Sequence, residues 1–224
     1  MKIIVVAKSP LAGLVKTRLC PPLDHGQAAE VALAALADTL DAVAASGADE
    51  RWIALSGPPG DWIPPGFVVI EQRGSTFGER LANAWDEAGG PALQIGMDTP
   101  QLTSVDLDSS CSALLSSRGA VLGPAEDGGW WALGLKRPDP RVFDGVVMSS
   151  RRTGRDQELR LESLGLEPAL LAVRKDVDFW VDALAVAATC PAGRFGQVVS
   201  RLARDRSAGR RPMHTSVLTA GDES

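Results

Sequence analysis

The chain has 224 residues, 45% of them hydrophobic, and its 23 basic and 28 acidic side chains give a formal charge of −5. This length fits one domain whose core is large enough to fold without disulfides or a structural metal. The acidic balance argues against a general binder of nucleic acids or anionic membranes, although it allows a local basic site for one small anion.

The cysteines and the apolar runs predict a soluble cytoplasmic protein. Cys20, Cys111 and Cys190 are scattered, with no metal-ligand or redox spacing, which is typical of reduced thiols. The N-terminal apolar run, residues 3–7, is too short for a signal peptide, and no run is long enough to span a membrane.

Strands and helices are predicted to alternate along the first half of the chain. Residues 3–7 are β-branched and apolar without polar alternation, which is typical of a strand buried on both faces. A helix is expected over residues 27–46, because leucine and valine recur at spacings of three and four, and Asp24 with Gln27 forms a capping pair. Further strands are expected at 52–55, 67–70 and 92–95, and further helices at 78–87 and 103–117.

The second half continues the alternation. Strands are expected at 121–122, 130–135 and near 170–173, and helices at 179–188 and 195–202. This order implies an α/β sheet with helices on both faces. Residues 205–224 are rich in Arg, Ser and Gly without an apolar period, so they are expected to form a flexible tail after a single domain of residues 1–204.

Four polar segments follow predicted buried strands: residues 8–19, 96–100, 123–129 and 175–178. In open α/β sheets, ligands bind beyond the carboxyl ends of the strands. We therefore expect these segments to converge on one site.

The first segment carries Lys8, Lys16 and Arg18 together with Gly13 and Thr17. Backbone N–H groups and a hydroxyl can bond to phosphate oxygens while the cations neutralise the charge, which favours a diphosphate site. A solvated loop whose cations face water explains the same residues equally well, since neither Walker A nor Rossmann glycine spacing is present.

Two segments carry candidate metal ligands. Asp98, at the end of a buried strand, is placed to bind a hard cation such as Mg²⁺, but it could equally form a turn before a helix. Asp176 and Asp178 share a face of an extended segment, so one of them could complete a metal site with Asp98. Alternatively, Asp178 could cap the helix that follows.

The remaining segment contains Asp127, Gly128 and Gly129 before two tryptophans. Asp-Gly between apolar runs is a strong hairpin signal, so a purely conformational role competes with a functional one. In the functional interpretation, the glycines let the backbone approach a ligand and Asp127 is a base or a ligand. Trp130 and Trp131 must point to opposite faces of a strand, so at most one is expected to line a pocket.

Catalysis by a serine or cysteine nucleophile and a zinc site are both disfavoured. Either would need histidine partners, and the chain has two histidines, at a helix start (His25) and in the C-terminal stretch (His214).

Three motifs, in matching order over about residues 1–190, resemble those of a family of bacterial GT-A-fold transferases. They are Ala7-Lys8-x-Pro10-x-x-Gly13-x-Val15-Lys16-Thr17-Arg18-Leu19-Cys20-Pro21-Pro22-Leu23, then Gly96-x-Asp98-x-Pro100-x-Leu102, then Gly123-Pro124-Ala125-x-Asp127-Gly128-Gly129. That family includes the glycosyltransferases proposed for arsenosugar biosynthesis. The motifs are more distantly similar to those of phospholactate and molybdenum-cofactor guanylyltransferases.

The resemblance implies a nucleotide-diphospho-sugar transferase-like fold, with α/β/α layers around a mostly parallel sheet. It also implies that Mg²⁺ or Mn²⁺ is held by Asp98 and Asp178. The implied nucleotide-binding residues are Ala7, Lys8, Pro10, Gly13, Lys16, Thr17, Arg18, Gly78, Arg80 and Gly96. Asp176, Gly128, Gly129 and Trp130 are further candidates for the metal or acceptor site. Where the family often has two tyrosines after the glycine pair, this chain has two tryptophans, and it lacks the Gly-Gly-x-Gly-Thr-Arg loop of sugar pyrophosphorylases.

Glycosyl transfer from a nucleotide-diphospho-sugar to a small-molecule acceptor is the favoured function. Lys8, Lys16 and Arg18, together with the metal, would stabilise the departing nucleoside diphosphate, and Asp127 would be the general base. Nucleotidyl transfer from a nucleoside triphosphate to a small phosphorylated acceptor is the alternative, and it needs no strong base. A non-catalytic nucleotide-binding protein of the same fold is the third hypothesis.

Overall fold

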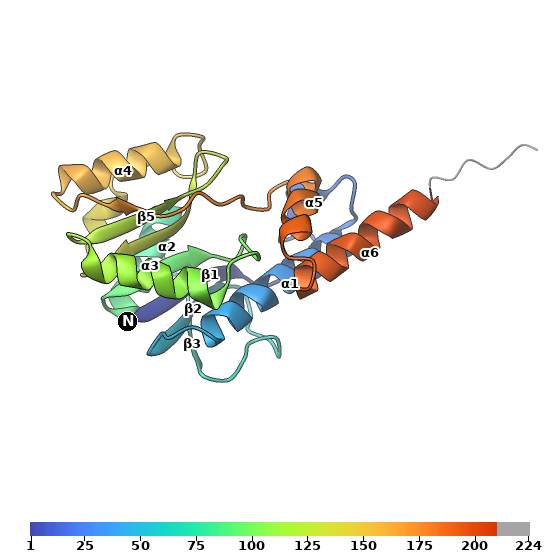
Figure 1. The fold of residues 1–224 in the computed structure, drawn as a ribbon, viewed down its shortest axis with the longest axis horizontal. Coiled ribbons are helices and arrows are strands. Elements are labelled where there is room, and N and C mark those ends of the chain that lie inside the picture. The colour runs from blue at the N-terminus through green and yellow to red at the C-terminus, as the bar shows by residue number, and fades with distance from the viewer. Residues whose placement is uncertain (210–224) are drawn as a thin grey trace, which may run out of the picture.

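A seven-stranded sheet in the order β3-β2-β1-β4-β6-β5-β7 lies at the centre of the computed structural model, which describes residues 1–209 (Figure 1). The strands are β1 (Lys2–Lys8), β2 (Glu50–Ser56), β3 (Phe67–Glu71), β4 (Ala92–Gly96), β5 (Ala120–Pro124), β6 (Trp130–Leu135) and β7 (Ala169–Leu170). All pairs are parallel except those that β6 makes with β4 and β5. The predicted mostly parallel α/β sheet is confirmed.

Burial and turn chemistry explain the central strands. Ile3, Ile4 and Val5 are 0% exposed, because β1 is paired on both sides and covered on both faces. The tight turn that contains Asp127 and Gly128 makes β5 and β6 antiparallel, since so short a connection must reverse the chain. The hairpin predicted from the Asp-Gly signal is therefore present.

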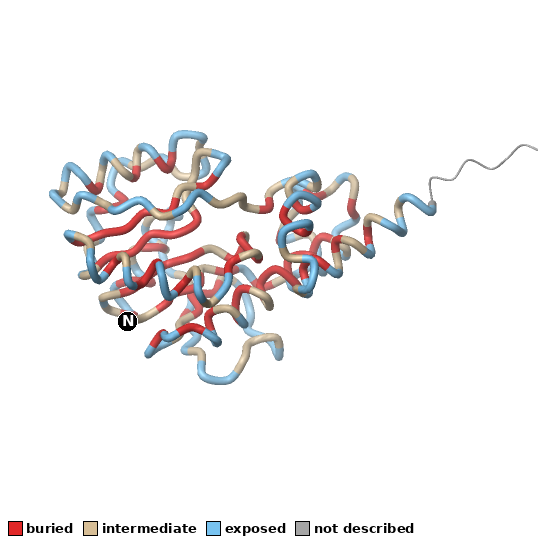
Figure 2. The backbone as a smooth tube through the Cα atoms, in the orientation of Figure 1, coloured by how far each residue is buried: buried red, intermediate tan, exposed pale blue. Residues whose placement is uncertain are grey.

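Helices cover both faces of the sheet. They are α1 (His25–Ala44), α2 (Phe77–Ala88), α3 (Ser104–Ser116), α4 (Thr153–Ser163), α5 (Trp180–Thr189) and α6 (Arg194–Gly209), with the short 3₁₀ helices η1 (Thr17–Leu19) and η2 (Pro140–Phe143). Helices α1 and α3 pack on one face, whereas α2, η2 and α4 pack on the other. Figure 2 shows the buried positions running along the strands and the inner sides of these helices. The three-layer arrangement is confirmed.

A further apolar cluster joins α5 and α6 to the outer side of α1. Phe195 and Val199 of α6 pack with Val31 and Ala35 of α1, and in Figure 1 both C-terminal helices lie at the end of the molecule away from the sheet. Helix α6 continues to Gly209, past residue 204, where the expected tail begins. The rest of that expected tail, residues 210–224, lies outside the described residues.

Helix α4 and strand β7 also differ from the expectations. Helix α4 was not predicted, because its sequence is mostly polar and within it only Thr153, Gly154, Gln157 and Leu161 are buried. Strand β7 has two residues rather than four, since its pairing with β5 is limited to Val121 and Leu122. Among residues 1–209, no helix is both long and apolar enough to cross a membrane, and all three cysteines are free.

Candidate functional site

A cleft of 1220 Å³ opens at the carboxyl ends of β1 and β4. The loops after β1, β4 and β5 and the segment before α5 all line it, as the sheet topology predicted. The predicted residues that line the cleft are Ala7, Lys8, Lys16, Thr17, Arg18, Gly96, Asp98, Asp127, Gly128, Gly129, Trp130, Asp176 and Asp178.

The structure places four predicted nucleotide-binding residues outside the lining of this cleft: Pro10, Gly13, Gly78 and Arg80. Gly13 has a φ of +79° with open space around it, so it serves the turn of the first loop. Gly78 lies in α2 against Phe143, which would be 3.3 Å from a Cβ at that position. The Arg80 guanidinium lies over the ring of Phe77 at 5.7 Å. None of these four residues faces the cleft.

The cations of the first loop pair with aspartates from distant segments. Lys16 has a side chain only 7% exposed, and its Nζ lies 2.7 Å from Asp98 Oδ1. It also donates to the carbonyl of Val177. Arg18 lies 2.6 Å from Asp178 Oδ2. Two of the three cations expected at a diphosphate, Lys16 and Arg18, are therefore paired with the two aspartates expected at a metal.

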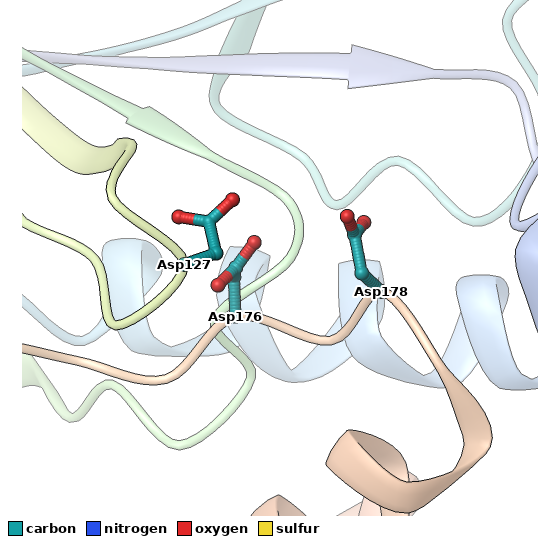
Figure 3. Close-up of side chains that lie close together, drawn as sticks. All are labelled: Asp127, Asp176 and Asp178. Carbon is teal, nitrogen blue, oxygen red and sulfur yellow. The ribbon is translucent and has the colours of Figure 1, made fainter. Parts of the chain in front are cut away.

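Three carboxyl groups gather on one side of the cleft. Asp127, Asp176 and Asp178 each offer an oxygen, and these oxygens lie within 4.8 Å of one another (Figure 3). Partial burial, together with the negative charges of the neighbouring Asp127, Asp178 and Asp98, raises the pKa of Asp176 to about 6. Asp127 Oδ1 accepts a hydrogen bond from the backbone N–H of Gly129 at 2.7 Å. Like charges this close repel one another, and a divalent cation would relieve that repulsion.

The two predicted metal ligands, Asp98 and Asp178, lie in different ion pairs. Asp98 is paired with Lys16, whereas Asp178 lies with Asp127 and Asp176. The two parts are nevertheless adjacent, since the N–H of Val177 donates to the Asp98 carbonyl at 2.9 Å. Carboxylate oxygens alone suit a hard cation such as Mg²⁺ or Mn²⁺, so the residues fit the expected metal.

The alternative role of Asp178 as a helix cap is not supported. The N–H of Phe179, at the start of α5, is bonded at 2.8 Å to the carboxylate of Asp182. Asp178 is left to pair with Arg18 and to face the cleft.

A second wall of the cleft, residues 148–153, had no signal in the sequence. Met148, Ser149, Ser150, Arg151 and Thr153 all line the cleft. Residues 148–152 precede the unpredicted helix α4, and Thr153 is its first residue. None of them directly follows a strand, so neither periodicity nor topology could find them. The glycines of the β5–β6 turn hold this wall in place.

That contact explains the glycine at position 128. Gly128 has a φ of +91°, and a Cβ there would overlap the carbonyl oxygen of Arg151. Its own carbonyl accepts the N–H of Gly154 at 2.8 Å. The close backbone approach requires glycine.

The two tryptophans point to opposite faces of the sheet, as expected. Trp131 is buried with the α1 and α3 layer, and its Nε1 donates to the Ala172 carbonyl at 3.0 Å. Trp130 packs against the α2 and α4 layer. Both border the cleft, so the expectation that only one of them would do so is wrong.

Solved structures share this fold. A proposed nucleotide-diphospho-sugar transferase from Desulfovibrio desulfuricans G20 matches with a TM-score of 0.82 and 24% identity, over 92% of this chain and 95% of the other. A cytidylyltransferase from Leptospira borgpetersenii serovar Hardjo-bovis (strain JB197) matches with a TM-score of 0.53 and 11% identity, over 95% and 98%. A CMP:2-keto-3-deoxy-manno-octonic acid synthetase complexed with CTP matches with a TM-score of 0.50 and 11% identity, over 91% and 98%.

At these identities the structures establish the fold, which is nucleotide-diphospho-sugar transferase-like, and nothing finer. No curated protein matches the chain. A family model described as "uncharacterized protein conserved in bacteria" matches residues 28–150, which is more than half of the sequence. The chain therefore belongs to that family, DUF2064.

Proposed function

We propose that this protein is a metal-dependent transferase that uses a nucleotide-activated donor, and that it transfers a sugar from a nucleotide-diphospho-sugar to a small acceptor. One observation carries the proposal: the cleft brings the cationic loop after β1 together with four aspartates. The fold shared with a proposed nucleotide-diphospho-sugar transferase supports it.

Donor binding would exchange the ion pairs of the cleft. In this structure, Lys16 and Arg18 are paired with Asp98 and Asp178. A diphosphate offers these cations stronger, multiply charged partners, and their move to its oxygens frees both carboxylates. Lys8, which makes no ion pair within residues 1–209, adds charge at the same end of β1. Nucleotide and metal should therefore promote each other's binding.

The freed carboxylates are the ligands that we assign to the metal. Asp178 lies with Asp176 and Asp127 within 4.8 Å, and Asp98 is joined to this segment through the N–H of Val177. A divalent cation bound there would supply positive charge beside the diphosphate. The aspartates would position the cation at the edge of the sheet.

Asp127 is the proposed general base for the transfer. The acceptor hydroxyl oxygen forms a bond to the anomeric carbon of the donor sugar, the bond from that carbon to the diphosphate oxygen breaks, and the hydroxyl proton passes to the Asp127 carboxylate. Its Oδ1 is held by Gly129, which orients the group and leaves Oδ2 for the proton. Lys16 and Arg18 stabilise the negative charge on the leaving nucleoside diphosphate.

Nucleotidyl transfer is the second candidate. The fold is also that of a cytidylyltransferase and of a synthetase complexed with CTP. The position of Asp127 in the carboxylate cluster suits a metal ligand as well as a base. In this reaction an acceptor phosphate attacks the α-phosphorus of a nucleoside triphosphate and pyrophosphate leaves, so no strong base is needed.

A panel of nucleoside triphosphates and nucleotide sugars, each with Mg²⁺ or Mn²⁺, tests the proposal. Release of nucleoside diphosphate from a nucleotide sugar supports glycosyl transfer, and release of pyrophosphate supports the second candidate. At saturating metal, Asp127→Asn should lower kcat about 100-fold for glycosyl transfer and much less for nucleotidyl transfer. Asp86→Asn, on the exposed side of α2, is the matched control. Metal-dependent binding without turnover of any donor would contradict both candidates and favour a non-catalytic nucleotide-binding protein.

A further inference from the structure

We infer that residues 148–153 form the acceptor side of the cleft, and that Arg151 binds an anionic group on the acceptor. This inference rests on the proposed function, in which the loop after β1 holds the donor. It names the substrate class: a small hydroxylated molecule that carries a carboxylate or a phosphate.

The size of the cleft leaves room for a second ligand. Pockets for one drug-sized ligand range from about 300 to 1,000 Å³, and this cleft measures 1220 Å³. The part near β1 carries Lys8, Lys16 and Arg18. Another part of the lining combines the apolar Trp130 and Met148 with the polar residues 149–151, which suits a ligand with both apolar and polar groups.

The acceptor wall is rigidly held. The hydroxyl of Thr153, a residue 5% exposed, donates to the Val147 carbonyl at 2.8 Å and accepts the N–H of Ser150 at 2.9 Å. Ser149 has a φ of +58°, which a serine keeps only when its surroundings enforce it. The contact with Gly128 fixes the other side. A wall fixed before binding loses little conformational entropy when a ligand arrives.

The charge of Arg151 indicates which class of acceptor this wall would bind. Lys16 and Arg18 are paired with aspartates, whereas Arg151 makes no ion pair within the described part of the chain. The backbone of Arg151 lies against Gly128, next to Asp127 and its two acidic neighbours. Those carboxylates repel an anion, so an anionic acceptor needs a cation on this wall. Arg151 is that cation, and a guanidinium suits carboxylate and phosphate equally.

Isothermal titration calorimetry on the full chain with Mg²⁺ tests the inference. The probes are glycerol 3-phosphate, glycerate and uncharged glycerol. Comparing the first two shows whether the site prefers a phosphate or a carboxylate. We expect at least one anionic probe to bind wild-type protein and glycerol not to bind. Arg151→Ala should weaken the anionic probe about 10-fold or more. Arg155→Ala, an exposed arginine of α4 outside the cleft lining, is the matched control and should change nothing.

Lys8→Ala and a titration with nucleoside diphosphate distinguish binding at the donor side of the cleft from binding at the acceptor side. Arg151→Ala should leave nucleoside diphosphate affinity within about 2-fold, whereas Lys8→Ala should lower it. Anionic probes that bind equally to wild type and Arg151→Ala, or that depend on Lys8 instead, would overturn the inference. If no nucleoside diphosphate binds but the anionic probe still requires Arg151, the proposed function fails and the anion site stands. Arg151→Gln, which keeps the size of the side chain, replaces Arg151→Ala if that variant does not fold.

Discussion

The substitution Gly128→Ala should destabilise the protein far more than the same substitution at Gly66. Both glycines have a similar φ, +91° at Gly128 and +86° at Gly66. An alanine in this region costs about 1–2 kcal/mol at either position. At Gly66 nothing lies within 4 Å of the new Cβ, so the cost should end there.

At Gly128 two further effects add to the cost. The Cβ overlaps the Arg151 carbonyl, and the backbone shift that removes the overlap costs about 1–3 kcal/mol. The same shift weakens the hydrogen bond from Gly154 N to Gly128 O, which contributes about 1 kcal/mol. The total is about 3–6 kcal/mol.

Urea unfolding of wild type and both variants, with free energies extrapolated to water, measures the difference. Replacing glycine with alanine also lowers the conformational entropy of the unfolded chain, which stabilises both variants by the same amount. This contribution cancels when the two variants are compared. A difference under about 1 kcal/mol between the two variants would refute the close approach of the β5–β6 turn to residues 148–153. A loss of unfolding free energy in Gly66→Ala as large as that in Gly128→Ala would also refute this close approach.

Three other substitutions have expected outcomes. In metal-free protein, Asp176→Asn should raise stability above pH 6 by about 1–2 kcal/mol and leave it unchanged below pH 4. The pKa of Asp176 is raised from 3.8 to about 6, so the wild type loses stability as pH rises from 4 to 6. The unscreened loss is about 3 kcal/mol, and water in the open cleft reduces it. Urea unfolding in EDTA at both pH values checks this, and the same difference between variant and wild type at pH 4 and above pH 6 would contradict it. Lys16→Met should weaken nucleotide binding about 10-fold or more and tighten binding of Mn²⁺ alone, because Asp98 loses its cation; calorimetry that shows both affinities falling would be the opposite result. Trp131→Phe should cost about 1–3 kcal/mol, because the Ala172 carbonyl loses its indole donor, and an unchanged unfolding midpoint would count against that bond.

Local patterns were enough to predict most of the secondary structure. The apolar run at residues 3–7 marked the central strand, and Asp24 with Gln27 marked the start of α1, where both hydrogen bonds of the capping box are present. These features depend on neighbours in the sequence. Helix α4 lacks such a signal because its few buried residues are spread among charged ones.

Topology extended the prediction to the site. Parallel strands end at the same edge, so the polar segments after β1, β4 and β5 could be expected to meet, and they line one cleft. The sequence could not say which side chains pair. Lys16 with Asp98, and Asp127 with Asp176, are separated by many residues along the chain, and their distances depend on how the whole sheet twists and packs.

By itself, then, the sequence determined the succession of strands along the chain, the burial of the central strand, the cap of α1 and the polar segments at the edge of the sheet. Each of these follows from local periodicity and chain direction. Only the tertiary structure decided the ion pairs of the cleft, the raised pKa of Asp176 and the wall at residues 148–153. Electrostatic coupling and close backbone contact both act through space, and they vary steeply over a few ångströms that no spacing along the chain specifies.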